Sequence, residues 1–260
     1  MANEENDFTY DPSVNYDEDV MALQRQIEKE VADNAALMGA PCDFSLLAKE
    51  YEGDDVYTGK VEDLCSKYKS MRRTRGDGNC FYRAFGFAHL ERLLNDAAAM
   101  KQFKALVADS KDKLIEQGFP KFTLEDFHDT FMEVLEKVES GCGLTELEGI
   151  FNDAGYSDYL VVYLRILVSG HLQKEADFFM NFIDGGRSVK EFCSQEVEPM
   201  GREADHIHII ALTAALDTPV RVEYMDRGES KAVNAHDFPE GSAPQVCLLY
   251  RPGHYDILYK

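Results

Sequence analysis

The order of helix-like and strand-like segments is the feature that most limits the folds open to this chain of 260 residues. Apolar residues at helical spacing, with little proline or glycine, mark five segments in the middle of the chain: 85–94, 97–117, 123–138, 144–152 and 157–181. Alternating residues then predict strands at 220–224, 246–250 and 254–259, with the last two joined as a hairpin. This order predicts an α+β domain in which helical layers pack around a small, mostly antiparallel sheet.

The segment 77–84 places a cysteine where a turn meets a helix. Gly76 and Gly78, which tolerate unusual backbone angles, stand just before Cys80, and apolar residues at helical spacing follow it. The free amides and positive dipole end of a helix start favour the thiolate, which is the nucleophilic form. Amides in such a turn are also suited to holding an oxyanion. The alternative is a small core residue, which is the usual role of a lone cysteine.

A cysteine nucleophile in acyl transfer needs an imidazole, and the imidazole needs an orienting group. His254 and Asp256 are two residues apart on a predicted strand, so their side chains share one face. An isolated pair of this kind is more often a surface pair. Whether this face meets Cys80, 174 residues earlier, does not follow from the spacing of these residues.

These residues resemble the ovarian-tumour (OTU) cysteine peptidases and, within them, the otubains. The resemblance rests on the segments 77–85, 205–212, 222–226 and 250–259. It implies a papain-like OTU cysteine peptidase fold with an N-terminal helical arm. It also implies that Cys80 is the nucleophile, His254 the general base and Asp256 its orienter, while Asp77 shapes the oxyanion loop. Gly76 departs from the pattern of many otubains, which have proline there.

Charge and cysteine usage limit the partners and the setting. A net charge of −21 argues against nucleic acid and favours partners with basic or mixed basic and apolar surfaces. The sequence contains no run of about 18 apolar residues, so it predicts no membrane span. The six cysteines include no Cys-x-x-Cys pair and no secretory segment opens the chain, so we expect neither disulfides nor structural zinc. The predicted location is the cytoplasm, with the nucleus as a second candidate.

His206 and His208 are candidate metal ligands, because residues two apart on a strand share one face. No third ligand at recognisable spacing accompanies them, and the isoleucines around them favour a core element instead. The sequence therefore predicts no metal and no cofactor.

Acidic residues concentrate near the N-terminus. Residues 1–63 carry 17 acidic and 4 basic side chains, whereas the remaining 197 residues carry 31 and 23. This shift predicts a mobile acidic arm, residues 1–40, before a catalytic domain, residues 41–260. Four apolar residues of the arm share one helix face: Val20, Leu23, Ile27 and Val31. This stripe packs on its own domain, stays disordered, or docks on a partner.

The resemblance implies a deubiquitinase that cleaves ubiquitin chains, preferentially lysine-48-linked ones. The acceptor ubiquitin would lie on the arm stripe. The donor ubiquitin would contact residues on the domain: Phe178, Asp184, Glu203, His206, His208 and Ile210. Two weak sites on one molecule favour only the linkages whose geometry spans both.

Two other functions remain open from the sequence. The resemblance also implies a non-catalytic inhibitor that binds ubiquitin-charged conjugating (E2) enzymes. That surface would comprise Phe119, Phe122, Phe127, Asp158 and Tyr159. An unrelated cysteine acyltransferase or peptidase acting on small substrates would instead need a deep, self-contained pocket.

Overall fold

A six-stranded sheet organises the computed structural model, which describes residues 35–228 and 230–260. The strands are β1 (Met38–Cys42), β2 (Ser70–Thr74), β3 (Val220–Tyr224), β4 (Asn234–Phe238), β5 (Val246–Arg251) and β6 (His254–Tyr259). Their order across the sheet is β1-β2-β6-β5-β3-β4, and every neighbouring pair is antiparallel except β3 and β5. The predicted mostly antiparallel sheet and its C-terminal hairpin are confirmed.

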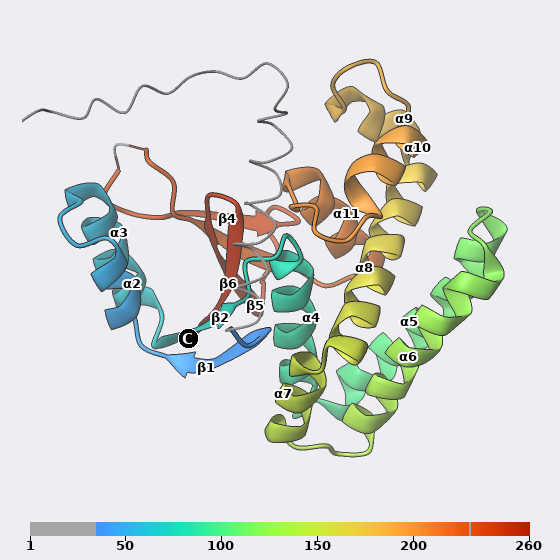
Figure 1. Cartoon of the computed structure of the whole chain (residues 1–260), viewed down its shortest axis with the longest axis horizontal. Coiled ribbons are helices and arrows are strands. Elements are labelled where there is room, and N and C mark those ends of the chain that lie inside the picture. The colour runs from blue at the N-terminus through green and yellow to red at the C-terminus, as the bar shows by residue number, and fades with distance from the viewer. Residues whose placement is uncertain (1–34, 229) are drawn as a thin grey trace, which may run out of the picture. The chain divides into compact units, whose positions relative to one another are not determined.

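Helices precede and interrupt these strands (Figure 1). They are α2 (Ser45–Glu50), α3 (Asp55–Lys67), α4 (Cys80–Leu93), α5 (Ala97–Glu116), α6 (Lys121–Glu139), α7 (Leu144–Asn152), α8 (Ala154–Lys174), α9 (Ala176–Phe179), α10 (Val189–Phe192) and α11 (His206–Leu216). A 3-10 turn (Met180–Phe182) and a π-helical turn (Cys193–Val197) follow α9 and α10. The predicted helix at 157–181 is therefore divided near Glu175.

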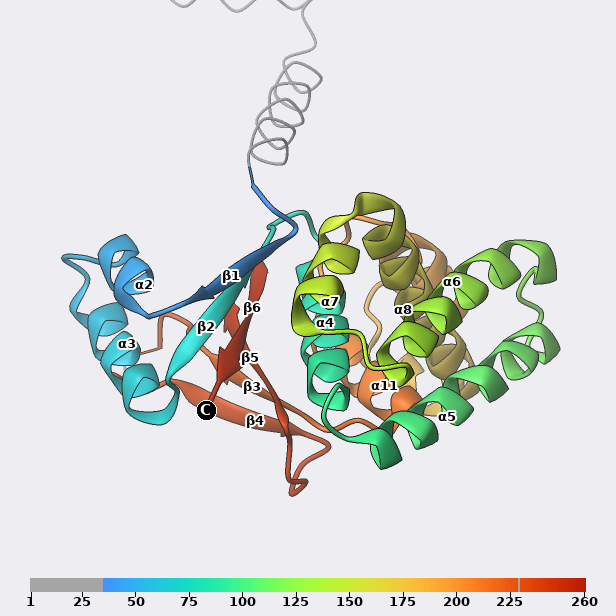
Figure 2. The ribbon, with the colours of Figure 1, turned by 90° about the horizontal axis from the view of Figure 1, so that it is seen from below.

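The two faces of the sheet contribute to different cores, as the alternation of β-strands requires. On β5, Val246 and Leu248 join a large core with α4, α5, α6 and α8, whereas Cys247 and Leu249 join a smaller core with α2 and α3. Figure 2 shows α2 and α3 on one side of the sheet and the other large helices on the opposite side. Both layers of the predicted α+β fold are thus present.

The acidic residues up to 63 that follow the predicted arm belong to the folded domain. Leu47 on α2 and Val61 on α3 are buried, whereas Glu50 and Glu62 on the same helices are exposed. A count of charged residues takes no account of the apolar residues spaced among them. Strand β1 also crosses the predicted boundary at residue 40 and pairs with β2. The arm residues Val20, Leu23, Ile27 and Val31 lie outside the described residues.

Helix α4 is buried on nearly every side, which explains why it can fix a side chain at its start. Phe81, Phe85 and Phe87 are each at most 1% exposed. A helix that is apolar all round belongs in a core. Helix α4 begins at Cys80, so the core holds this cysteine at the helix N-terminus. None of the helices formed by the described residues has the length and apolar character to cross a membrane.

Candidate active site

His254 connects Cys80 to Asp256. The His254 Nε2 atom lies 2.9 Å from Asp256 Oδ1, and the ring also interacts with the Cys80 sulfur. The Nδ1 atom lies beside the turn before Cys80, 3.5 Å from the position that a Cβ on Gly76 would occupy. The structure therefore brings the three predicted residues together, with the imidazole between the thiol and the carboxylate.

Asp256 is fully buried, and each of its carboxylate oxygens has a strong donor. Oδ1 accepts from the Thr74 amide at 3.0 Å and from His254, and Oδ2 accepts from Arg251 at 2.7 Å. Burial would raise the pKa of this carboxyl, but the hydrogen bond from His254 and the charges of His254 and Arg251 lower it below its ordinary value. Asp256 is therefore an anion that fixes the ring orientation.

The electrostatic balance at His254 favours its protonated form. Burial would lower the pKa of this imidazole, but its hydrogen bonds to Asp256 and Cys80 and their charges raise the pKa to about 9. At neutral pH the ring is therefore an imidazolium. A positive imidazolium beside the sulfur stabilises the nucleophilic thiolate and holds a proton for a leaving group.

The turn before Cys80 depends on Gly78. This glycine has φ +73°, and a Cβ on it would lie 2.1 Å from the carbonyl oxygen of Gly201. Only glycine fits such an approach. The turn delivers the chain to the start of α4, where amides have no intrahelical acceptor and are suited to holding an oxyanion.

Asp77 lies in this turn but serves a different role from Asp256. Its carboxylate accepts the Asn79 amide at 2.9 Å and two hydrogen bonds from Arg83, at 2.8 and 3.0 Å. Arg83 is fully buried and also donates to Ser157 and Asp158 on α8. Asp77 thus ties the turn to α4 and α8, the arrangement expected of a residue that shapes the loop.

A second buried arginine, Arg165 on α8, also binds the turn before Cys80. One of its nitrogens donates to the Gly78 carbonyl and to the Asn79 side chain, both at 2.9 Å. The same nitrogen donates to the Arg202 carbonyl at 2.7 Å, so Arg165 bridges the two loops that meet at Gly78. The sequence analysis missed this residue. Its signal is a lone charge within the apolar segment 160–168.

The predicted donor-ubiquitin residues divide into exposed and buried ones. Phe178 and Ile210 are 54% and 39% exposed, and Asp184, Glu203 and His206 are exposed as well. The prediction that His208 contacts ubiquitin is wrong, because His208 is 3% exposed and its Nδ1 accepts the Asp205 amide in a helix cap.

The segment that carries His206 and His208 is a helix rather than a strand. Asp205 caps the start of α11, and on a helix residues two apart point in different directions. The two imidazoles therefore do not share a face. Within residues 35–228 and 230–260, no cluster of His, Cys, Asp and Glu is arranged to hold a metal ion.

The predicted E2 surface is partly exposed and aromatic. Phe122 is 83% exposed and Tyr159 is 40% exposed, and the Tyr159 ring lies 5.0 Å from that of Phe127. Phe119 and Phe127 are half-buried against the large core. Asp158 lies beside Tyr159 in the chain and 3.4 Å from Arg83.

Comparisons with known proteins agree with this site. The family model "Peptidase C65 Otubain" matches residues 30–260. Ubiquitin thioesterase OTUB1 of Homo sapiens is 58% identical over 246 residues, 94% of this chain and 91% of that protein. Ubiquitin thioesterase OTUB2 of Homo sapiens is 40% identical over 223 residues, 86% of this chain and 95% of that protein.

Solved structures agree as well. The complex described as "h/ceOTUB1-ubiquitin aldehyde-UBCH5B~Ub" superimposes with a TM-score of 0.88 at 40% identity, covering 94% of this chain and 98% of the other. A related complex with UBC13~Ub also has a TM-score of 0.88, at 39% identity, covering 95% of this chain and 99% of the other. With its fold, its Cys80–His254–Asp256 arrangement and these likenesses, the chain belongs to the otubain family of cysteine peptidases.

Proposed function

We propose that this protein is a thiol isopeptidase that cleaves ubiquitin chains. The observation that carries the proposal is the placement of Cys80, at the start of a buried helix, next to His254, which is hydrogen-bonded to Asp256. Its relatives are named ubiquitin thioesterases, and the similar solved complexes contain ubiquitin aldehyde, which supports ubiquitin as the substrate.

Each residue has one task in the proposed reaction. The Cys80 sulfur attacks the carbonyl carbon of the C-terminal glycine of ubiquitin, and the backbone amide of Cys80, at the start of α4, holds the resulting oxyanion. His254 gives its proton to the departing lysine amine as the carbon–nitrogen bond breaks. His254 then takes a proton from water, whose oxygen attacks the thioester and releases ubiquitin and the Cys80 thiolate. Asp256 keeps the ring oriented throughout.

A preference for lysine-48-linked chains belongs to the same proposal. It requires a donor ubiquitin near Phe178 and Ile210 and an acceptor ubiquitin on the arm stripe of residues 20–31. Deleting residues 1–34 should then reduce cleavage of this linkage much more than cleavage of a small ubiquitin ester, because only the chain uses both sites. Equal losses on the two substrates would contradict this mode of selection.

The catalytic assignment is tested with di-ubiquitins of every linkage and a ubiquitin C-terminal electrophile that traps reactive thiols. Cys80→Ala should abolish both cleavage and trapping. Cys65→Ala is the matched control: Cys65 is an exposed cysteine on α3, outside the catalytic turn, so its removal should change neither readout. Trapping that persists in Cys80→Ala would contradict the assignment.

A second function, restraint of ubiquitin transfer by binding E2 enzymes, is favoured by the exposed Phe122 and by the contact between the Phe127 and Tyr159 rings. The similar solved complexes contain the ubiquitin conjugates UBCH5B~Ub and UBC13~Ub, which supports charged E2 enzymes as partners. This role uses no bond cleavage. Cys80→Ala should therefore still slow chain synthesis by an E2 enzyme.

Two exposed phenylalanines separate the roles. Phe122→Asp should weaken the restraint of chain synthesis at least tenfold and leave hydrolysis of a ubiquitin ester unchanged. Phe182, 64% exposed near Phe178, is the matched control on the predicted donor-ubiquitin side. Phe182→Asp should raise the KM for the ester. If neither variant weakened the restraint of chain synthesis, that result would contradict E2 binding at this surface.

A further inference from the structure

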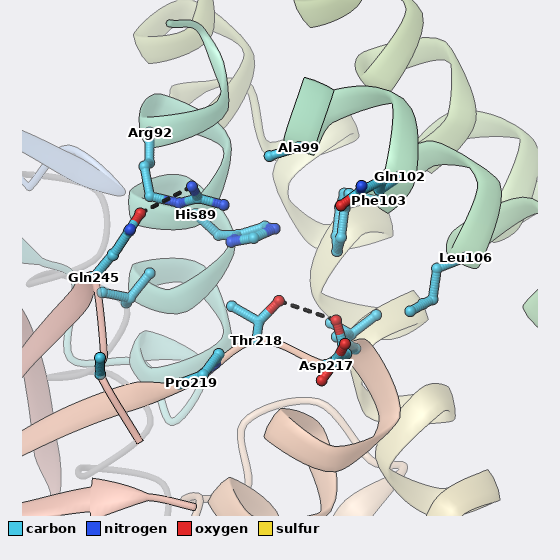
Figure 3. Close-up of a pocket in the computed structure, with 13 residues that line it drawn as sticks. His89, Arg92, Ala99, Gln102, Phe103, Leu106, Asp217, Thr218, Pro219 and Gln245 are labelled. Carbon is cyan, nitrogen blue, oxygen red and sulfur yellow. Dashed lines mark hydrogen bonds between the residues drawn. The ribbon is translucent and has the colours of Figure 1, made fainter. Parts of the chain in front are cut away.

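A cavity of about 270 Å³ lies beside the C-terminal half of α4, away from the catalytic turn (Figure 3). Its walls come from α4, α5, the end of α11 and the segment before β5, and include His89, Phe103, Leu106, Leu216, Thr218 and Val246. His89 follows Cys80 by nine residues, about 13 Å along a helix. The volume is near the lower end of small-molecule sites, roughly 300 Å³.

His89 is the unusual residue of this cavity. It is 3% exposed, and neither ring nitrogen has a hydrogen-bond partner. Its ring stacks on Phe85 and meets Phe103 edge to face, with centroids 4.3 Å apart, and it points from α4 into the cavity (Figure 3). A buried polar group without a partner costs about 1 to 3 kcal/mol, so it calls for an explanation, such as an ordered water or a bound ligand.

The protonation state of His89 limits what it binds. Burial lowers the pKa of this imidazole to about 3, so the ring is neutral at physiological pH. A neutral imidazole offers one N–H donor and one lone-pair acceptor, and no charge. Its natural complement is an uncharged group that donates a hydrogen bond.

The charged side chains at the cavity also argue against an ionic ligand. Arg92 donates to Gln245 at 2.9 Å and lies 3.6 Å from Asp96, so its charge is already partnered. Asp217 lines the cavity with φ +47°, a backbone conformation that a glycine adopts more readily. The carboxylate of Asp217 repels an anionic ligand.

We propose that this cavity is a binding site for a small uncharged aromatic molecule that carries a hydroxyl or ring N–H group. Both His89 nitrogens are closed to solvent in this structure, so the imidazole turns towards the cavity for the donor group to bond to one of them. The ligand ring packs against Phe103 and Leu216. A site of this kind is separate from the ubiquitin chemistry, and the proposal stands whether or not the protein cleaves ubiquitin.

The test compares phenol with toluene, which has nearly the same shape and no hydroxyl. Protein labelled with ¹⁵N-histidine is titrated with each probe, and the ring-nitrogen resonances of His89 and the midpoint of thermal unfolding are followed. Phenol should shift the His89 resonances, raise the midpoint, and bind at least tenfold more tightly than toluene. Trapping of Cys80 by a ubiquitin electrophile should not change, because the catalytic turn is elsewhere.

Two variants make the test decisive. His89→Phe keeps the aromatic stack but removes both nitrogens, so it should bind toluene at least as tightly as phenol. Leu106→Phe fills the cavity without changing His89 and should abolish binding of both probes. Equal affinity for phenol and toluene in the wild type would overturn the proposal. Unmoved His89 resonances at high phenol concentration, as expected if the cavity holds only water, would overturn it too.

Discussion

The two sides of the active site are built in different ways. On the sheet side, His254, Asp256 and Arg251 lie within one hairpin, to which β2 adds the amide of Thr74 and α2 adds the carboxylate of Glu50, which accepts from Arg251 at 3.1 Å. On the helix side, the turn that carries Cys80 is held by Arg83 and Arg165, whose partners come from loops and helices far apart in the chain. The base is therefore fixed locally, whereas the nucleophile depends on tertiary structure.

This difference separates effects on chemistry from effects on folding. A change on the sheet side should reduce catalysis more than stability, since the backbone pairing of β5 and β6 does not depend on the hydrogen bonds to the ring. A change on the helix side should affect stability and catalysis together.

Asp256→Asn should have the largest effect, and on catalysis. An amide cannot stabilise the imidazolium as a carboxylate does, so kcat/KM for a ubiquitin ester should fall by about 10³- to 10⁴-fold. The pKa of His254, about 9 in the wild type, should move down towards its ordinary value. Histidine NMR titration measures this pKa. An unchanged pKa would show that Asp256 does not set the charge of the ring.

Arg165→Met should act mainly on stability. It leaves the carbonyls of Gly78, Val197 and Arg202 without their donor in a buried site. Denaturant unfolding should show a loss of about 3 to 5 kcal/mol. Arg187→Met is the control, because Arg187 is a half-exposed arginine whose ion pair with Glu196 is worth about 1 kcal/mol or less. Similar losses in both variants would remove the contrast between the two sides.

Gly78→Ala tests the close approach of the two loops. The new methyl group would overlap the Gly201 carbonyl, so the turn must move and kcat/KM should fall about 100-fold, equivalent to about 3 kcal/mol. Gly118→Ala is the matched control. Gly118 also has a positive φ, +96°, but a Cβ there meets no atom within 4 Å. Strain from φ alone should cost about 1 kcal/mol of stability and no activity.

The pH dependence of stability sharpens the role of His254. Its pKa is higher in the folded protein, about 9, than the ordinary 6.5, so protonation stabilises the fold. That contribution is complete below pH 6.5 and is lost as the pH rises through 9. The unfolding free energy of wild type minus that of His254→Gln should therefore decrease by roughly 2 to 3 kcal/mol across this window. A difference that is constant with pH would contradict the raised pKa.

Asp158→Asn should have the smallest effect on hydrolysis. Arg83 keeps its bidentate pair with Asp77, and Asp158 is a half-exposed partner at 3.4 Å. Stability should change by less than about 1 kcal/mol and ester hydrolysis by less than twofold. A larger loss of hydrolysis, measured as kcat/KM, would show that the predicted E2 surface and the catalytic turn depend on each other.

The sequence predicted the local parts of the molecule better than the long-range ones. The alternation at 254–259 and the helix signal after Cys80 were sufficient, because both are local patterns. The segment 205–212 was ambiguous, since its isoleucines suit a strand and a buried helix equally, and the cap by Asp205 decided it. No local pattern shows that Arg165 reaches Gly78, 87 residues away. The partners of a buried cation follow from tertiary packing alone.

The position of β6 between β2 and β5 means that the chain cannot acquire a reactive thiol until its sheet is closed. Until β6 inserts, Cys80 begins a helix without its imidazole, so it lacks the proton donor that the reaction needs. Strand pairs so distant in sequence form late and slowly. Reaction with a thiol-trapping ubiquitin electrophile during refolding should therefore follow the completion of the sheet rather than the appearance of helix. The same delay prevents the Cys80 thiol of a folding intermediate from attacking neighbouring proteins.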